Sequence, residues 1–226
     1  MKGLPENYHI RNEIYSNSNT GRSLFRIVDT LINLDYSLKV FELNKNKIKE
    51  IDKEIVALNR LPFGLAPKCH RKWFSQDKRT LFILIDWVEG KSLYDLCKNP
   101  PLNKQDIMFR LNILEELATS ISKLNKLRVI HRDLKPQNII VRTERFYINS
   151  LYLIDFGLSS QSRSVEEGSH NYRSPEQYLY RNNILTPASD IYSFCQIGWF
   201  LMFGRPRLME ENFDNTDWDE TESAGL

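Results

Sequence analysis

Polar and apolar side chains alternate along the first 43 residues, between groups of turn-forming residues. An alternation with a period of two is typical of β-strands that bury one face. The pattern predicts three antiparallel strands, at residues 8–15, 23–34 and 36–43. Strand character returns at residues 72–74 and 80–88. We therefore expect the chain to begin with a small sheet.

A period of three and four residues marks the helices. One amphipathic helix is predicted between Lys45 and Arg60, with its apolar stripe at Ile48, Ile51, Ile55 and Leu58. A long core helix is predicted to begin at Asn103, which with Asp106 resembles an N-cap. A third helix, at residues 187–203, is apolar nearly all round, so we expect it to be buried.

Between the last two helices lie short strand-like pieces at residues 138–141, 146–149 and 151–155, and a serine-rich loop at 159–169. A sheet followed by helices predicts an α+β fold.

Gly90, Pro100 and Pro101 interrupt the pattern after the last strand of the first sheet. We expect one domain unit at residues 1–88, a second at 89–209, and a loose tail at 210–226 with seven acidic residues and no basic one.

Composition narrows the function classes. The 226 residues are 41% hydrophobic and carry a net charge of +2, which favours a globular protein and argues against nucleic acid or a membrane as partner. The longest apolar run, at 194–203, is too short to cross a bilayer, and no secretory signal precedes the first strand. The three cysteines, Cys69, Cys97 and Cys195, form no CxxC pair, which predicts buried thiols and a cytoplasmic location.

The strongest chemical signal is the octapeptide HRDLKPQN at residues 131–138, followed by DFG at 155–157. Phosphoryl transfer needs a carboxylate that accepts a hydroxyl proton, a cation near the moving phosphate, and oxygen ligands for Mg²⁺. Asp133 and Lys135 can supply the first two of these. The metal ligands would be Asn138 and Asp155.

These motifs resemble those of the eukaryotic-like, or Hanks-type, serine/threonine protein kinases. The resemblance covers about residues 8–206. It implies a two-lobed fold, with an N-lobe of antiparallel sheet and one helix and a mainly helical C-lobe. It also implies ATP and Mg²⁺ as cofactors and a protein substrate. Lys135, and Ser169 in the pocket beside the acceptor residue, match the serine/threonine branch.

The resemblance also assigns nucleotide-binding residues. Lys39 is similar to the strand lysine that grips the α- and β-phosphates, and Glu54 to its helix partner. The stretch at 81–93 resembles the fifth strand and hinge, with Ile85 as gatekeeper and the backbone of Asp86 and Val88 facing the adenine.

Residues 14–23 stand where the family has its glycine-rich loop. Ile14 and Gly21 would contact the nucleotide there. Ser16 and Ser18 replace the first two glycines, and Ser23 replaces the valine that packs on the adenine.

Other residues are given structural roles by the resemblance. Asp190 would tie its helix to the catalytic loop, in which His131 precedes Arg132, and Phe156 belongs to the DFG motif. Arg132 would pair with a phosphate on the activation loop, whose candidate sites are Ser159, Ser160, Ser162 and Ser164.

The family continues for several helices beyond this sequence, so we expect a truncated C-lobe. Glu176, in the segment that resembles the family's APE motif, would then lack its usual arginine partner. The apolar helix at 191–203 would remain partly uncovered, which favours a partner chain or self-association.

The leading hypothesis is an ATP-dependent kinase that transfers the γ-phosphate to serine and threonine hydroxyls of proteins, with Asp133 as the base. One alternative is a pseudokinase or scaffolding module, favoured by the glycine-poor loop. Another is a small-molecule kinase of the aminoglycoside phosphotransferase kind, against which the SPE sequence at 174–176 argues.

Overall fold

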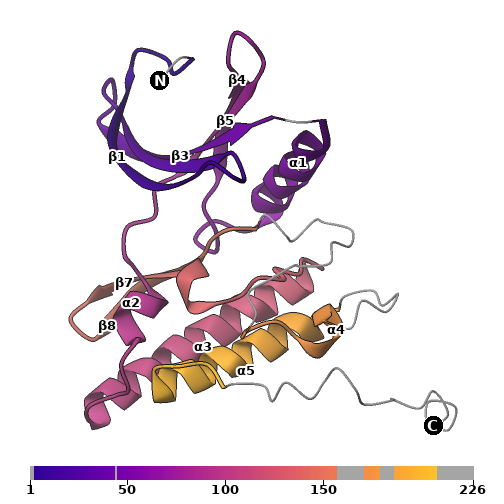
Figure 1. Ribbon diagram of the computed structural model, residues 1–226. Coiled ribbons are helices and arrows are strands. Elements are labelled where there is room, and N and C mark those ends of the chain that lie inside the picture. The colour runs from indigo at the N-terminus through magenta and orange to yellow at the C-terminus, as the bar shows by residue number, and fades with distance from the viewer. Residues whose placement is uncertain (1–2, 44, 157–170, 179–185, 208–226) are drawn as a thin grey trace, which may run out of the picture.

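The computed structural model describes residues 3–43, 45–156, 171–178 and 186–207. Its first part is a five-stranded antiparallel sheet with the strand order β1-β2-β3-β5-β4 (Figure 1). The strands are β1 (Tyr8–Asn17), β2 (Arg22–Asp29), β3 (Leu34–Glu42), β4 (Cys69–Phe74) and β5 (Thr80–Asp86). All five lie where the alternation predicts strands, although residues 30–33 form a turn rather than the end of the second strand.

Strand β5, which lies between β3 and β4, is buried on both faces, because its residues 81–85 are all apolar. One face of the sheet packs Phe82 and Leu84 against Leu38 of β3. The opposite face packs the remaining β5 side chains against Ile51 of helix α1 (Lys45–Arg60). The predicted amphipathic helix is therefore confirmed, and its apolar stripe attaches it to the sheet.

The second part is built on two helices, α3 (Lys104–Lys126) and α5 (Ala188–Phe203), which lie side by side (Figure 1). Asn103 caps α3, since its side chain accepts a hydrogen bond from the Asp106 N–H at 2.9 Å, as predicted. The smaller elements are β6 (Lys91–Ser92), α2 (Leu93–Cys97), η1 (Pro136–Asn138), β7 (Ile139–Glu144), β8 (Tyr147–Leu153) and α4 (Pro175–Tyr178). Together the two parts form an α+β fold with two lobes, joined by the segment at residues 87–90, called the hinge below.

The structure corrects two predictions about this second lobe. The pieces predicted at 146–149 and 151–155 form one continuous strand, β8, with a register shift opposite Arg142 and Thr143. Helix α5 is not buried all round: Ile191, Trp199 and Phe203 are 49%, 40% and 49% exposed. Within the described residues, α3 packs along one side of α5, and Tyr94 of α2 stacks on Phe200 of α5. A partner chain over the other side stays a prediction.

The cysteines also differ from the prediction. All three are free, and Cys97 is buried, but Cys69 is half-buried and Cys195 is exposed on α5. Among the described helices, none is long and apolar enough to cross a membrane.

A buried arginine joins three helices of the second lobe. The side chain of Arg110 on α3 is 4% exposed and pairs with Asp106 one turn earlier, at 3.2 Å. Its Nη1 donates to the Leu201 carbonyl of α5 at 2.6 Å and to the Cys97 carbonyl of α2 at 3.3 Å. One guanidinium thus satisfies two carbonyls at helix ends, which otherwise have no intrahelical partner.

Replacing Arg110 by methionine should lower the free energy of unfolding by about 3 kcal/mol, because the change removes the donor to two carbonyls and the cationic partner of the Asp106 carboxylate. Urea unfolding monitored by circular dichroism measures this difference. Lys123→Met, at an exposed position of the same helix, is the control and should change stability by less than about 0.5 kcal/mol. Equal effects of the two substitutions would contradict the assigned role.

Candidate active site

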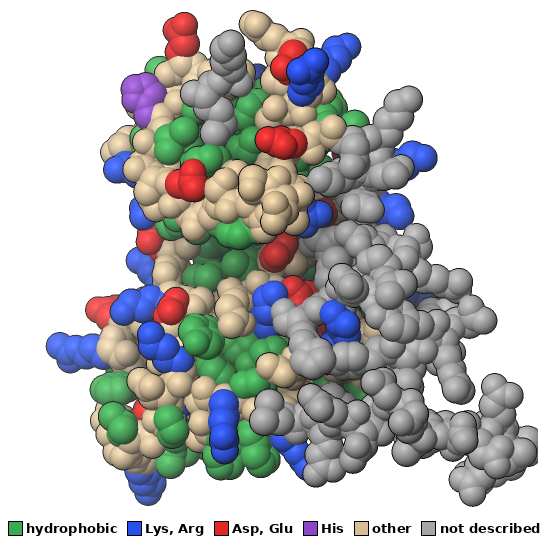
Figure 2. All heavy atoms as spheres, viewed as in Figure 1, with side chains coloured by type: hydrophobic (Ala, Val, Ile, Leu, Met, Phe, Trp, Pro, Cys, Tyr) green, Lys and Arg blue, Asp and Glu red, His purple; other side chains and the backbone are tan. Residues whose placement is uncertain are grey.

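A cavity of about 920 Å³ lies between the sheet and the helical lobe. Figure 2 shows it as a hollow at mid-height, with hydrophobic side chains inside and charged side chains near its edge. Sites for small organic ligands have volumes of about 300–1,000 Å³, so a nucleotide-sized molecule fits. The lining includes Leu24, Lys39, Ile85, Trp87, Asn138 and Asp155.

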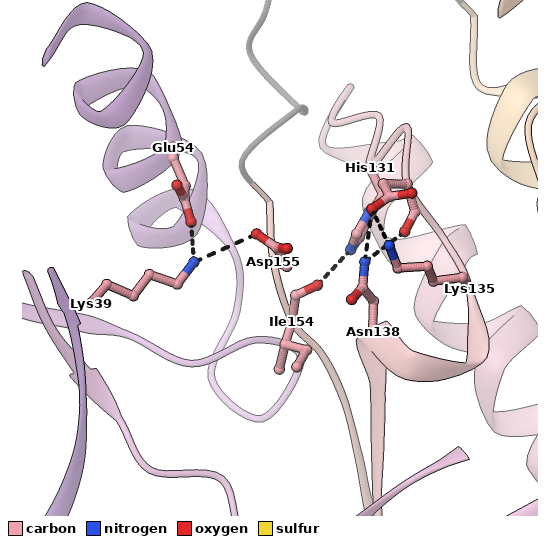
Figure 3. Close-up of polar contacts among 8 residues, drawn as sticks. Lys39, Glu54, His131, Lys135, Asn138, Ile154 and Asp155 are labelled. Atoms are coloured by element: carbon pink, nitrogen blue, oxygen red, sulfur yellow. Dashed lines mark hydrogen bonds and ion pairs between the residues drawn. The ribbon is translucent and has the colours of Figure 1, made fainter. Parts of the chain in front are cut away.

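Lys39 connects the two lobes across this cavity. Its Nζ lies 2.6 Å from Glu54 Oε1 on α1 and 3.6 Å from Asp155 Oδ1, just after β8 (Figure 3). Glu54 is buried because it lies on the same side of α1 as the buried residues Ile51 and Leu58, three positions before it and four after it. The ion pair expected between Lys39 and Glu54 is therefore present.

Electrostatic interactions keep both Lys39 and Asp155 charged. Burial acts to lower the pKa of Lys39, but the carboxylates of Glu54 and Asp155 outweigh it and raise that pKa above its ordinary value. The positive charge of Lys39 lowers the pKa of Asp155, against the opposing effect of burial. A cation and a carboxylate thus face the cavity together at neutral pH.

The catalytic loop, residues 131–138, brings three polar side chains together. Lys135 Nζ donates to Asp133 Oδ2 at 2.9 Å, and Asn138 Nδ2 donates to the same oxygen at 3.1 Å. Asn138 Nδ2 also lies 2.9 Å from the Asp133 backbone carbonyl. These contacts orient the Asp133 carboxylate next to the cavity, where Figure 3 shows Lys135 and Asn138 close to each other.

Asp190, the third residue of α5, holds the catalytic loop in place. Its two carboxylate oxygens accept the backbone N–H groups of His131 and Arg132, at 2.8 and 2.9 Å. Burial raises the pKa of Asp190, although the two N–H groups oppose this effect. Arg132 has a φ of +69°, a left-handed conformation that an arginine rarely adopts without support from its surroundings.

His131 also holds the DFG segment in place. His131 Nε2 lies 3.0 Å from the Ile154 carbonyl, and its ring centroid is 4.4 Å from that of the buried Phe156. The side chain of Asp155 is 56% exposed and its backbone has a φ of +63°, a conformation that aspartate tolerates better than most residues. The DFG aspartate therefore turns away from the core and toward the cavity.

The end of β5 and the hinge border the cavity, and Ile85, Asp86 and Val88 line it there. The Asp86 N–H donates to the Lys68 carbonyl at 3.0 Å. The Asp86 carboxylate in turn accepts the Lys68 N–H at 2.8 Å and lies 2.5 Å from His70 Nε2. These contacts hold the end of β5 against the start of β4.

The structure corrects the predicted nucleotide contacts at the β1–β2 turn. Ile14 lines the cavity, but Gly21 is not among the described lining residues. Gly21 has a φ of +58°, and a Cβ there would lie 2.8 Å from Glu42 Cβ. This glycine is therefore required by the close approach of the turn to β3, rather than by a phosphate.

Ser23 is among the residues that line the cavity. On β2, Leu24 pairs with Lys39 and Ser23 pairs with Val40. Because strand side chains alternate between faces, Leu24 shares the cavity face with Lys39, and Ser23 belongs to the opposite face. Ser23 reaches the cavity rim, where its hydroxyl lies 2.9 Å from that of Ser16. Leu24 is thus the apolar residue that can cover a base.

Glu176 has a partner other than the expected arginine. It is half-buried on α4, and its Oε1 accepts a hydrogen bond from the Ser189 hydroxyl at 2.7 Å. The predicted pocket residue Ser169 lies outside the described residues, as do the candidate phosphosites Ser159, Ser160, Ser162 and Ser164.

Sequence reasoning missed two contacts that shape the site. Gln177 Nε2 donates to the Arg132 carbonyl at 2.9 Å, so α4 also holds the catalytic loop. Arg26 of β2 lies 4.4 Å from the ring centroid of Trp87 and 2.9 Å from Glu89 Oε1, which links the sheet to the hinge. The position of Gln177 directly after the SPE sequence is a weak sequence signal for its contact with the catalytic loop. No sequence signal points to the contacts of Arg26 with the hinge.

The donor set fits a magnesium–nucleotide complex. Mg²⁺ in nucleotide sites is held by one or two protein oxygens together with phosphate oxygens. The Ile154 N–H donates to the Asn138 carbonyl at 2.9 Å, which places Asn138 and Asp155 next to each other. No group of three or more His, Cys, Asp or Glu side chains able to hold a metal occurs within the described ranges.

Comparison with known proteins agrees with this geometry. The chain is 30% identical over 132 residues to the serine/threonine-protein kinase PrkC of Bacillus subtilis, covering 55% of this chain and 19% of PrkC. It is 30% identical over 131 residues to PknA of Corynebacterium glutamicum, covering 55% and 26% of the two chains. It is 29% identical over 181 residues to human ribosomal protein S6 kinase alpha-3, covering 75% and 23%.

The chain thus spans about a quarter or less of the length of the relatives that it matches. The protein kinase domain family, which generally uses ATP and Mg²⁺, matches residues 21–224. The match includes the strand lysine, the catalytic loop and the DFG segment described above, and the chain belongs to the protein kinase domain family.

Proposed function

We propose that this chain catalyses the transfer of the γ-phosphate of ATP to serine and threonine hydroxyls of proteins. The observation that carries the proposal is the convergence of Lys39, Lys135, Asn138 and Asp155 on one cavity, with Asp133 beside them. The names of the related proteins, which are serine/threonine-protein kinases, support the substrate class.

Asp133 is the proposed base. A serine or threonine hydroxyl that attacks the γ-phosphate must lose its proton, and a carboxylate within hydrogen-bond reach can accept it. Lys135 and Asn138 both donate to one oxygen of this carboxylate, so its orientation is set before the substrate arrives.

The remaining residues are placed to bind the phosphates, the metal ion and the base of the nucleotide. Lys39, held by Glu54 at 2.6 Å, is placed to bind the phosphates of the nucleotide. Lys135 is placed to neutralise charge on the transferred group. Mg²⁺, held by Asn138 and Asp155 with phosphate oxygens, would neutralise the charge on the phosphates. Leu24 and Ile85 line the part of the cavity that suits the adenine ring.

The pseudokinase alternative has less support. Its motivation is the glycine-poor turn. Against it stand the ion pair of Lys39 with Glu54 and the hydrogen bond from Lys135 to Asp133. A small-molecule kinase is not favoured either, since the relatives act, by name, as serine/threonine-protein kinases.

Asp133→Asn should lower phosphate transfer to a serine- and threonine-containing peptide library by about 10²–10⁴-fold, because the amide cannot accept the proton. Transfer from radiolabelled ATP measures the effect, and the affinity for Mg-ATP should stay within about twofold. Asp77→Asn, the same change in the exposed β4–β5 turn, should leave the rate unchanged. Full activity of Asp133→Asn would refute the mechanism.

Mg-ATP should stabilise the folded chain by about 2.7 kcal/mol at a concentration one hundred times its Kd. Thermal unfolding with and without the nucleotide measures this shift. Chelation of the metal with EDTA, or Asp155→Asn, should remove most of it. No stabilisation by Mg-ATP at any concentration would favour the pseudokinase.

The Lys39–Asp155 contact predicts a pH dependence of stability. Lys39 lowers the pKa of Asp155 in the folded chain. The contribution of this contact to the free energy of unfolding should therefore be complete above the ordinary aspartate pKa of about 3.9. It should be lost as the pH falls through the lower pKa that Asp155 has in the folded chain. The difference in unfolding free energy between wild type and Asp155→Asn should thus be constant above about pH 5 and shrink below about pH 4. In a Lys39→Met background the same comparison should show little pH dependence, and an unchanged profile there would contradict the assignment.

A further inference from the structure

The β1–β2 turn uses its own backbone N–H groups internally. The Thr20 N–H donates to Asn17 Oδ1 at 3.1 Å, and the Gly21 N–H donates to the Ser18 carbonyl at 3.3 Å. Glycine-rich loops bind phosphates through backbone N–H groups that point at the ligand. These two N–H groups of the turn are already bonded, so the side chains beside the turn are a more available source of phosphate contacts from this part of the sheet.

Arg22 is the cationic side chain next to this turn that lines the cavity. On β2 it pairs with Phe41 of β3, and Leu24, two residues later, pairs with Lys39. Residues two apart on a strand share a face, so Arg22 and Lys39 lie on the same face as diagonal neighbours, a relation in which Cα atoms are about 7–8 Å apart. The two cationic side chains therefore extend from adjacent strands over one cavity.

The surroundings of Arg22 leave its guanidinium available to a ligand. Its carbon Cζ lies 5.8 Å from the ring centroid of Phe41, a cation–π contact that positions the side chain without neutralising it. Arg22 is exposed, and within the described part of the chain no carboxylate forms an ion pair with it.

The charges of the cavity also favour an anion at this place. The field of Arg22 acts to lower the pKa values of both Lys39 and Asp155, so its charge is felt at the centre of the site. Two cations that face one cavity repel each other, and a bound anion between them would relieve this repulsion.

We propose that Arg22 binds the phosphate chain of the nucleotide, so that a side chain of β2 supplies contacts that the backbone of the turn does not. This inference rests on the proposed function and extends it, because it makes selectivity for nucleoside triphosphate over the nucleoside depend on Arg22. The planar guanidinium can donate two parallel hydrogen bonds to phosphate oxygens, whereas a lysine ammonium acts as a point charge.

The test is isothermal titration calorimetry of wild type, Arg22→Gln and Arg22→Lys with Mg-ATP and with adenosine. Arg22→Gln should weaken Mg-ATP binding about 10- to 100-fold, the loss of one or two charge-assisted hydrogen bonds, and leave adenosine binding within about twofold. Arg22→Lys should fall between wild type and Arg22→Gln for Mg-ATP. Arg71→Gln is the matched control. Arg71 also lies over an aromatic ring, with its Cζ 5.3 Å from the ring centroid of Trp73, but it does not line the cavity.

Each result separates the two proposals. If wild type binds neither Mg-ATP nor adenosine, the proposed function fails. If wild type binds Mg-ATP and Arg22→Gln binds it equally well, the role of Arg22 is wrong and the proposed function stands. An equal loss of Mg-ATP and adenosine binding in Arg22→Gln would also overturn the inference, because it would mean a general effect on the fold. Arg22→Lys keeps the charge at this position and provides the same comparison if the glutamine variant does not fold.

Discussion

The arrangement of the site depends on one buried carboxylate. Asp190 accepts the backbone N–H groups of His131 and Arg132 at 2.8 and 2.9 Å, and so joins α5 to a loop almost sixty residues earlier. A buried carboxylate is costly unless it is hydrogen-bonded, and Arg132 needs support for its left-handed conformation. The helix and the loop therefore stabilise each other. Asp133, Lys135 and Asn138 owe their common position beside the cavity to this contact.

A second constraint acts across the cavity. Lys39 comes from the sheet and Asp155 from the helical lobe, and the 3.6 Å between their charged atoms connects the two lobes directly. Glu54 keeps the lysine in place from α1. The alternation of positive and negative side chains suits a ligand that itself combines phosphate anions with a metal cation. The position of Arg22 beside Lys39 extends the positive part of this surface toward the β1–β2 turn.

The β1–β2 turn shows how a family pattern can be met by other means. Side chains close the turn, through Asn17 and the hydroxyl pair of Ser16 and Ser23. The glycine that remains, Gly21, serves the approach of the turn to Glu42 of β3. The register of β2 against β3 then places Arg22 and Leu24 on the same strand face as Lys39, and both line the cavity.

Most of the strands, the helices and the motifs could be predicted from the sequence, because each depends on neighbours within a few residues. The stripe of α1, the Asn103 cap and the HRDLKPQN loop are signals of this kind. The tertiary structure was needed to show that Leu24, and not Ser23, lies on the same strand face as Lys39, since a shift of one residue in strand pairing reverses every side chain. It also decided the contacts of Arg26 with Glu89 and of Gln177 with Arg132, which join residues 63 and 45 positions apart. No local pattern encodes such pairs, because they form where two separately folded elements happen to meet in space.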